Sequence, residues 1–188
     1  MKPFDYWSSG RGLGEITPLG NDFPEGPKFK IWFPDIFFAQ DVVEFGCGVG
    51  RLAPYFSKRR YTGYDICPDA IEIARARNHG YQFEVIDDDV AIEGGHVGFA
   101  HNVLLHIPDD EIYRTIARFR QKRFIVTEVL GVDWRREGDP PVFNREIEGY
   151  ERPFVAAGYR LHRVQFHPTD YRPKGVAVDI AMLEFHLT

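Results

Sequence analysis

The 188-residue sequence has little of several things, and each shortage excludes a class of protein. Its two cysteines, Cys47 and Cys67, give neither a disulfide framework nor the spacing of a metal site. No apolar run approaches the length of a membrane span and no signal peptide is visible, so we expect a soluble, cytoplasmic protein. There are 23 basic residues against 28 acids, so nucleic acid is not an expected partner.

The length fits one domain with a sizeable core. Residues 1–39 are rich in glycine, proline and aromatic side chains such as Trp7, a composition too apolar for a disordered tail. We therefore expect an N-terminal arm or lid over 1–39, with a short helix within 28–39, and a ligand-binding domain over 40–188. The arm either closes over a ligand or patches the surface of the core.

The chain is organised around residues 41–51, where an apolar run precedes three glycines at every second position. Residues 42–45 are short enough for a buried strand, Gly46, Gly48 and Gly50 follow, and the segment from Arg51 predicts a helix. Glycine reaches positive φ and lets a ligand approach the main chain, and a helix N-terminus offers unpaired N–H groups. The pattern predicts a nucleotide-binding turn.

Glu44 completes an acid-x-Gly-x-Gly-x-Gly pattern, which differs from the Gly-x-Gly-x-x-Gly fingerprint of dinucleotide binding. In this pattern the chain resembles the class I S-adenosylmethionine (SAM)-dependent methyltransferases of small-molecule type. The resemblance covers residues 40–187. It implies SAM as cofactor and an α/β fold: a doubly wound, seven-stranded, mostly parallel Rossmann-like sheet with one antiparallel strand near the edge. An ordinary strand-to-helix turn that needs glycines is the alternative.

Acids at later strand ends match further signatures of this family. Asp65 ends a strand over 61–66, where the family's acid binds the ribose hydroxyls. The alternative role for Asp65 is to cap the helix that begins near Pro68. A third strand from Tyr81 ends in three acids, and the resemblance assigns the adenine amino group to Asp87 or Asp88.

The segment 97–110 resembles the family's fourth motif from Val103 through His106 to Asp109. It lacks the acids that would hold a magnesium ion, so no metal is expected. The resemblance implies a cofactor-binding set of Glu44, Gly46, Cys47, Gly48, Gly50, Asp65, Ile66, Asp87, Asp88 and Asn102.

Periodicity assigns the remaining elements. It predicts a helix over 109–119, a strand over 123–129, and a helix from 143 that ends at Gly158. Two antiparallel strands, 159–166 and 176–187, follow and are joined by a proline-rich loop. The connection 131–142 is longer than usual, which suggests a role in binding.

Methyl transfer from a sulfonium requires placement of the nucleophile and exclusion of water, and a base helps if the nucleophile carries a proton. His106 is the best-placed candidate base and His101 the second; the alternative for His106 is a packed residue that orients the turn. Trp7, Trp134, Arg135 and Arg136 are expected at the acceptor, where arginines hold a carboxylate or phosphate.

The sequence therefore predicts a SAM-dependent methyltransferase acting on oxygen or nitrogen of a small-molecule acceptor. The alternatives are a non-catalytic SAM-binding module and a protein or nucleic-acid methyltransferase. A nicotinamide-dependent oxidoreductase is disfavoured by the glycine spacing.

Overall fold

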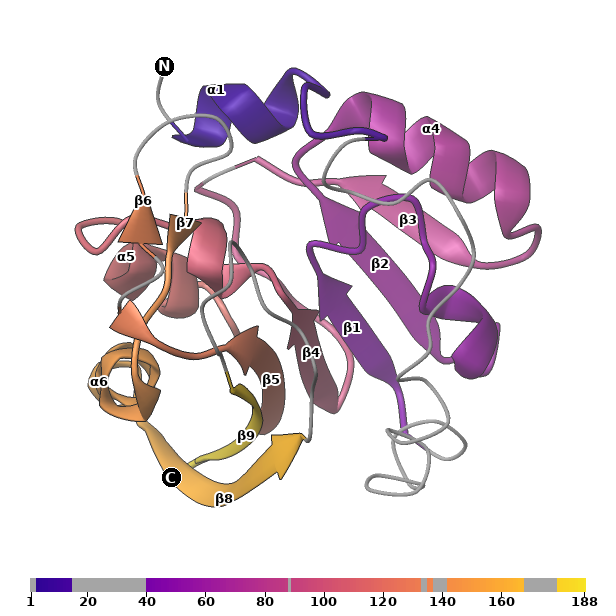
Figure 1. Cartoon of the computed structure of the whole chain (residues 1–188). Helices are drawn as coiled ribbons and strands as arrows, with labels where there is room; N and C mark the ends of the chain where they lie inside the picture. The colour runs from indigo at the N-terminus through magenta and orange to yellow at the C-terminus, as the bar shows by residue number, and fades with distance from the viewer. Residues whose placement is uncertain (1–2, 15–39, 88, 133–134, 137–141, 168–178) are drawn as a thin grey trace.

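The computed structural model describes residues 3–14, 40–87, 89–132, 135–136, 142–167 and 179–188 (Figure 1). Its main sheet has seven strands in the order β3-β2-β1-β4-β5-β9-β8. They are β1 (Val42–Phe45), β2 (Tyr61–Asp65), β3 (Gln82–Val85), β4 (Val97–His101), β5 (Arg123–Val129), β8 (Tyr159–His167) and β9 (Ile180–Leu187).

Strand pairing is parallel from β3 through β5, and β9 runs antiparallel to both of its neighbours. The order reverses at β1, because the chain runs from β1 outward to β3 and then returns to β4 on the other side. In open sheets of this kind, ligands bind outside the carboxyl ends of the strands at the point of reversal. The predicted sheet, with its one antiparallel strand next to an edge, is confirmed.

Helices cover both faces of the sheet (Figure 1). Successive residues of a strand point to opposite faces, so Val42 packs with helix α4 (Pro68–Arg77), and Val43 packs with α5 (Ile112–Ile116) and α6 (Ile147–Ala156). Strands buried on both faces read as largely apolar runs, which explains Val42, Val43 and Phe45 in β1, whereas Glu44 is a buried acid in the same strand.

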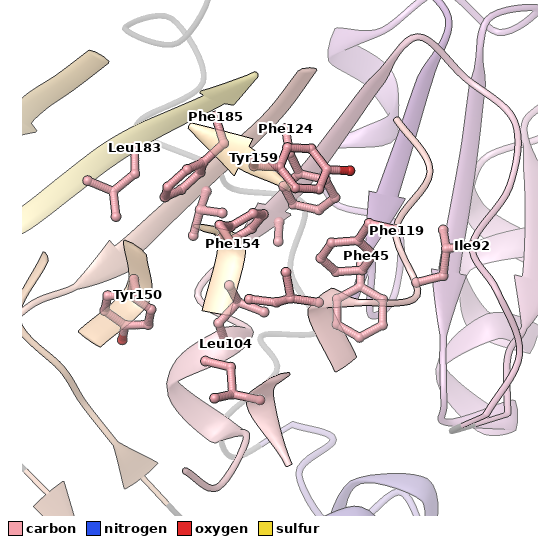
Figure 2. Close-up of a cluster of buried hydrophobic side chains, with 14 of the residues drawn as sticks. Phe45, Ile92, Leu104, Phe119, Phe124, Tyr150, Phe154, Tyr159, Leu183 and Phe185 are labelled. Carbon is pink, nitrogen blue, oxygen red and sulfur yellow. The ribbon is translucent and has the colours of Figure 1, made fainter. Parts of the chain in front are cut away.

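Aromatic rings fill much of the core between the sheet and α6 (Figure 2). The Phe154 ring of α6 stacks on Phe185 of β9 with centroids 4.0 Å apart, and Phe119 stacks on Phe124 of β5 at 4.2 Å. Each such side chain buries a large apolar area, and stacked pairs add to that stabilisation. This core anchors the half of the sheet that carries β4 and β5.

Three predicted helices are shorter in the structure. The segment after the glycines forms only a 3₁₀ turn, η1 (Ala53–Tyr55), because β2 begins soon afterwards and Leu52, Ala53 and Phe56 are buried within one compact bend. The helix predicted over 109–119 is α5, flanked by turns. The helix predicted from 143 begins at Ile147, because Val142–Phe143 is a strand, β7, paired with β6 (Arg135–Arg136).

The N-terminal arm contains helix α1 (Pro3–Ser8), which lies beyond the carboxyl ends of the strands, beside the N-terminal end of α4 (Figure 1). The helix predicted within 28–39 and the proline-rich loop from 168 lie outside the described residues. No helix in the described part of the chain combines the length and the apolar composition that crossing a membrane requires.

Candidate functional site

The three glycines after β1 all have positive φ, at 73°, 52° and 73° for Gly46, Gly48 and Gly50. A Cβ on Gly46 would lie 2.4 Å from a methyl of Val103, and one on Gly50 would lie 2.8 Å from the Phe83 ring. Glycine is therefore required at Gly46 and Gly50 for two reasons: the backbone φ is positive, and the neighbouring side chains leave no room for a Cβ.

Asp65 is tied to the same turn. One carboxylate oxygen accepts the N–H of Gly48 at 2.8 Å and the other accepts the N–H of Cys67 at 2.9 Å. Burial raises the pKa of Asp65, while the hydrogen bonds from Cys67 and Gly48 oppose that rise. Main-chain N–H groups therefore hold the carboxylate in place, and because its two oxygens have about four lone pairs in all, it can still accept a hydroxyl group. Cys67 caps α4 by accepting the N–H of Ala70.

Glu44 lies within the core, 2% exposed, where its carboxyl accepts the hydroxyl of Tyr61 from β2. Burial raises the pKa of Glu44 to about 8, against the opposing effects of the Tyr61 bond and the charge of Arg51. The cofactor role expected for Glu44 stays a prediction, and the partner that the structure gives this side chain is Tyr61.

The other residues expected to bind the cofactor follow β1, β2 and β3, and among them Asp87 and Asp88 are those expected at the adenine. Ile66 is half-buried after β2, and Cys47 is buried within the glycine turn. Asp87 has an exposed side chain, and its carbonyl accepts an Arg118 N–H at 2.5 Å. Asp88 lies outside the described residues.

The arm brings Trp7 against His106. Their ring centroids are 4.3 Å apart with planes inclined at 55°. Further along, a Cβ on Gly10 would lie 3.2 Å from an oxygen of Asp69 in the first turn of α4, and Leu13 packs against the buried cluster of Val49, Cys67 and Ala70. The arm thus reaches from the turn after β4 to the glycine turn and the start of α4.

The second candidate base, His101, ends β4, and its ring nitrogen Nε2 lies 3.5 Å from the side-chain nitrogen Nδ2 of Asn102. Asn102 takes a left-handed φ of 53°, and its N–H bonds the carbonyl of Thr127. Residues other than glycine adopt this conformation mainly when they are Asn or Asp. The ring contact with Trp7 of the arm is made by the other candidate base, His106.

The polar atoms that are buried without a hydrogen-bond partner in the described part of the chain include the indole Nε1 of Trp7 and the side-chain oxygen of Asn102, both at this end of the sheet. A buried donor or acceptor left unpaired costs about 1–3 kcal/mol. The Trp7 donor and the Asn102 acceptor can therefore pair with a ligand, and SAM carries both a carboxylate that accepts and an ammonium that donates. With the glycine turn and Asp65, these residues fit SAM.

Two residues that the sequence reasoning missed hold the turn after β4. Glu128 of β5 and Arg145, which precedes α6, are both buried and both bond main-chain atoms of residues 103–107. Burial raises the pKa of Glu128 to about 8, opposed by the N–H groups of Leu104, Val103 and Leu105. Glu128 could have been found from sequence, since it is the one acid in the apolar strand 123–129 and a buried charge needs hydrogen-bond partners.

The loop expected to bind the acceptor is described only in part. Arg135 and Arg136 form β6, which pairs with Phe143 and Val142 of β7, and β7 packs near the turn η2 (Leu104–His106). This brings the β6–β7 hairpin to the end of the sheet that carries His106. Trp134 lies outside the described residues, and the directions of the arginine side chains stay a prediction.

A separate cluster of His162, Glu184 and His186 lies on β8 and β9, near the amino end of β5. The Glu184 carboxylate accepts hydrogen bonds from Arg123 and Arg163 as well as from His186. Burial alone would raise the pKa of Glu184, but these partners outweigh burial and lower it. Two guanidinium groups therefore occupy the lone pairs that a metal ion would need.

Residues 42–122 match the family model of the methyltransferase domain. The match ends before β5, so Glu128, Arg145 and the β6–β7 hairpin lie beyond it. No curated protein matches the sequence.

Solved structures of methyltransferases share the fold at low identity. Magnesium protoporphyrin IX methyltransferase (ChlM) from Synechocystis PCC 6803, with bound SAH, is 16% identical at a TM-score of 0.66, over 87% of this chain and 81% of that one. A SAM-dependent methyltransferase from Mesorhizobium loti is 15% identical at 0.65, over 89% and 100%. The [4+2]-cyclase SpnF is 15% identical at 0.64, over 86% and 81%, so the fold also serves another reaction.

Proposed function

We propose that this class I SAM-dependent methyltransferase transfers the methyl group to an oxygen or nitrogen of a small polar molecule, with His106 as the base. The observation that carries the proposal is the contact of the His106 ring with Trp7 at 4.3 Å. This contact places an imidazole beneath the arm, at the carboxyl end of β4. Gly48 and Asp65, which we expect to hold the cofactor, lie at the ends of the neighbouring strands β1 and β2.

Methyl transfer requires few catalytic groups from this chain. SAM, held by the glycine turn and Asp65, would supply a methyl group activated by its sulfonium for attack by a lone pair of the acceptor, with demethylated SAM as the leaving group. The imidazole of His106 takes the proton that the acceptor oxygen or nitrogen loses, which is work suited to histidine near neutral pH.

The arm supports this role by excluding water. Its residues 3–14 span from His106 to the start of α4, so the segment covers the carboxyl ends of the strands between them. Closing a site in this way protects the reacting atoms from solvent and positions the substrates. We infer that residues 1–39 act as a lid on the domain formed by 40–188.

The proposed acceptor is a small polar or anionic molecule, such as a sugar or an aromatic acid. The support is the position of the β6–β7 hairpin, which packs near the turn that carries His106. Arg135 and Arg136 of this hairpin would hold a carboxylate or phosphate of the acceptor through paired hydrogen bonds, and Trp134 would form an apolar wall.

The first experiment tests transfer itself. Purified protein and methyl-labelled SAM are incubated with a panel of hydroxylated and amino-substituted aromatic acids, sugars and their phosphates, and labelled products are identified by mass spectrometry. Labelled product supports the proposal. SAM binding with no methylation of any panel member or of a protein or nucleic-acid extract would instead indicate a non-catalytic SAM-binding module.

The second experiment tests the base. His106→Ala should lower kcat by roughly a hundredfold to ten-thousandfold, the usual contribution of a general base, while SAM affinity stays nearly unchanged. His162→Ala, at the far edge of the sheet, is the matched control and should turn over normally. Normal turnover of His106→Ala across the pH range would show that the base is elsewhere or that positioning alone carries catalysis.

A further inference from the structure

The turn that carries His106 is held by a buried carboxyl group of the neighbouring strand. Oε1 of Glu128 accepts the N–H groups of Val103 and Leu104 at 2.9 and 2.7 Å, and Oε2 accepts that of Leu105 at 3.3 Å. Glu128 is fully buried. The first N–H groups of any helical turn have no carbonyl partner within it, so Glu128 supplies acceptors that the turn lacks.

The carbonyl side of the same turn is held by Arg145. Its guanidinium donates to the carbonyl of Leu104 at 3.0 Å and to that of Ile107 at 2.6 Å, and its Nε donates to a carboxylate oxygen of Asp109 at 2.9 Å. One buried side chain therefore bonds the main chain on both sides of His106. A planar guanidinium suits this because its donors are held in a rigid fork.

The turn has little structure of its own. Its local hydrogen bonds are those from the N–H of His106 to the carbonyl of Val103, at 3.0 Å, and from Ile107 to Leu104, at 3.1 Å. A single 3₁₀ turn is short, and its bonds are poorer than those of an α-helix. The main-chain course of the turn therefore depends on the two buried side chains as well as on its own hydrogen bonds.

We propose that Glu128 and Arg145 are positioning residues that hold the main chain of 103–107 so that the His106 ring lies on Trp7. This inference rests on the proposed role of His106 in methyl transfer. The positioning itself can be measured without turnover, so the two ideas fail separately. If Glu128 and Arg145 served only the stability of the fold, their replacement would lower the free energy of unfolding without moving the His106 ring.

The test replaces Glu128 by Met, which keeps the length of the side chain and removes both acceptor oxygens. Amide hydrogen exchange at Val103, Leu104 and Leu105 should then accelerate by at least about tenfold, because buried N–H groups lose their partners. The nuclear Overhauser contact between the His106 and Trp7 rings should weaken or vanish.

Milder variants keep the test decisive if that protein does not fold. Glu128→Gln retains one acceptor oxygen, and Arg145→Lys retains the charge without the fork; each should speed amide exchange in the turn by a smaller factor. Glu184→Gln is the control, because it also alters a hydrogen-bonded, buried carboxylate but at the other end of the sheet.

Unchanged exchange at residues 103–105 in all Glu128 and Arg145 variants would overturn the inference. So would an equal acceleration in Glu184→Gln, because it would mean that general loss of stability loosens the turn. A displaced ring in Glu128→Met together with normal turnover of His106→Ala would instead leave the positioning intact and refute the role of His106 as the base.

Discussion

The free energy of unfolding should depend on pH through the Glu44 carboxyl. This group is 2% exposed, it accepts the Tyr61 hydroxyl, and burial raises its pKa from 4.5 to about 8. A carboxyl whose pKa is higher in the folded protein stabilises the fold while it is protonated. That contribution is complete below about pH 4.5 and is lost as the pH rises through about 8.

The size of the effect follows from the two pKa values. Each unit of difference corresponds to about 1.4 kcal/mol, so the full span is on the order of 4–5 kcal/mol for Glu44. Between pH 5 and 7.5 the free energy of unfolding should fall by about 1.4 kcal/mol per pH unit through this group alone. Glu128, whose pKa is also about 8, adds a dependence of the same sign.

The variant Glu44→Gln isolates the contribution of Glu44. A neutral amide can still bond the Tyr61 hydroxyl but does not titrate. We expect the variant to be about as stable as the wild type at pH 5 and more stable at pH 8. The measurement is urea unfolding at half-unit steps of pH, compared with the same series for Glu184→Gln, whose lowered pKa places its effect below this range.

Equal slopes for the wild type and Glu44→Gln between pH 5 and 8 would refute the reasoning. Such a result would mean that the carboxyl is already ionised in the folded protein and that the Tyr61 bond and Arg51 offset the cost of its burial.

Four further predictions concern the cofactor site, the base and the arm. Gly48→Val should abolish SAM binding by calorimetry, because a bulky side chain would block the approach to the main chain; NAD binding without SAM binding by the wild type would contradict the assignment. Asp65→Ala should weaken SAM binding by about 1.5–3 kcal/mol, and unchanged affinity in a folded variant would remove this carboxylate from the site. His106→Ala should lose kcat far more than SAM affinity, as initial-rate kinetics would show. Deletion of residues 1–14 should lower SAM affinity or turnover more than the melting temperature of the free protein, whereas full activity would favour a surface patch.

The local geometry of the candidate site could be predicted from sequence where one short stretch carries the information, while its role in binding stays a prediction. The glycine turn and Asp65 fall in this group, because strand, turn and acid follow each other in the chain and obey local rules of backbone conformation. The structure adds why two of the glycines are needed: Gly46 lies against Val103, and Gly50 lies against Phe83. That Val103 and Phe83 are these neighbours cannot be inferred from the spacing of residues along the sequence.

Helix lengths were predicted less well, and for a physical reason. Periodicity marks which residues face the core, so Ile112, Ile116 and Phe119 are buried as expected. It does not mark where a helix must stop to let the next strand enter the sheet. The short η1 turn and the β7 strand before α6 result from those tertiary demands.

By itself the sequence determined the order in which the seven strands of the main sheet follow each other in the chain, the turn at Gly46 to Gly50 and the acid at Asp65, because these depend on local conformation and on burial patterns along the chain. Tertiary structure alone decided that Trp7 lies on His106 and that Glu128 and Arg145 hold the turn between them. Those contacts join segments far apart in the chain, and they form only when the sheet brings the ends of β4 and β5 together and the arm folds across them.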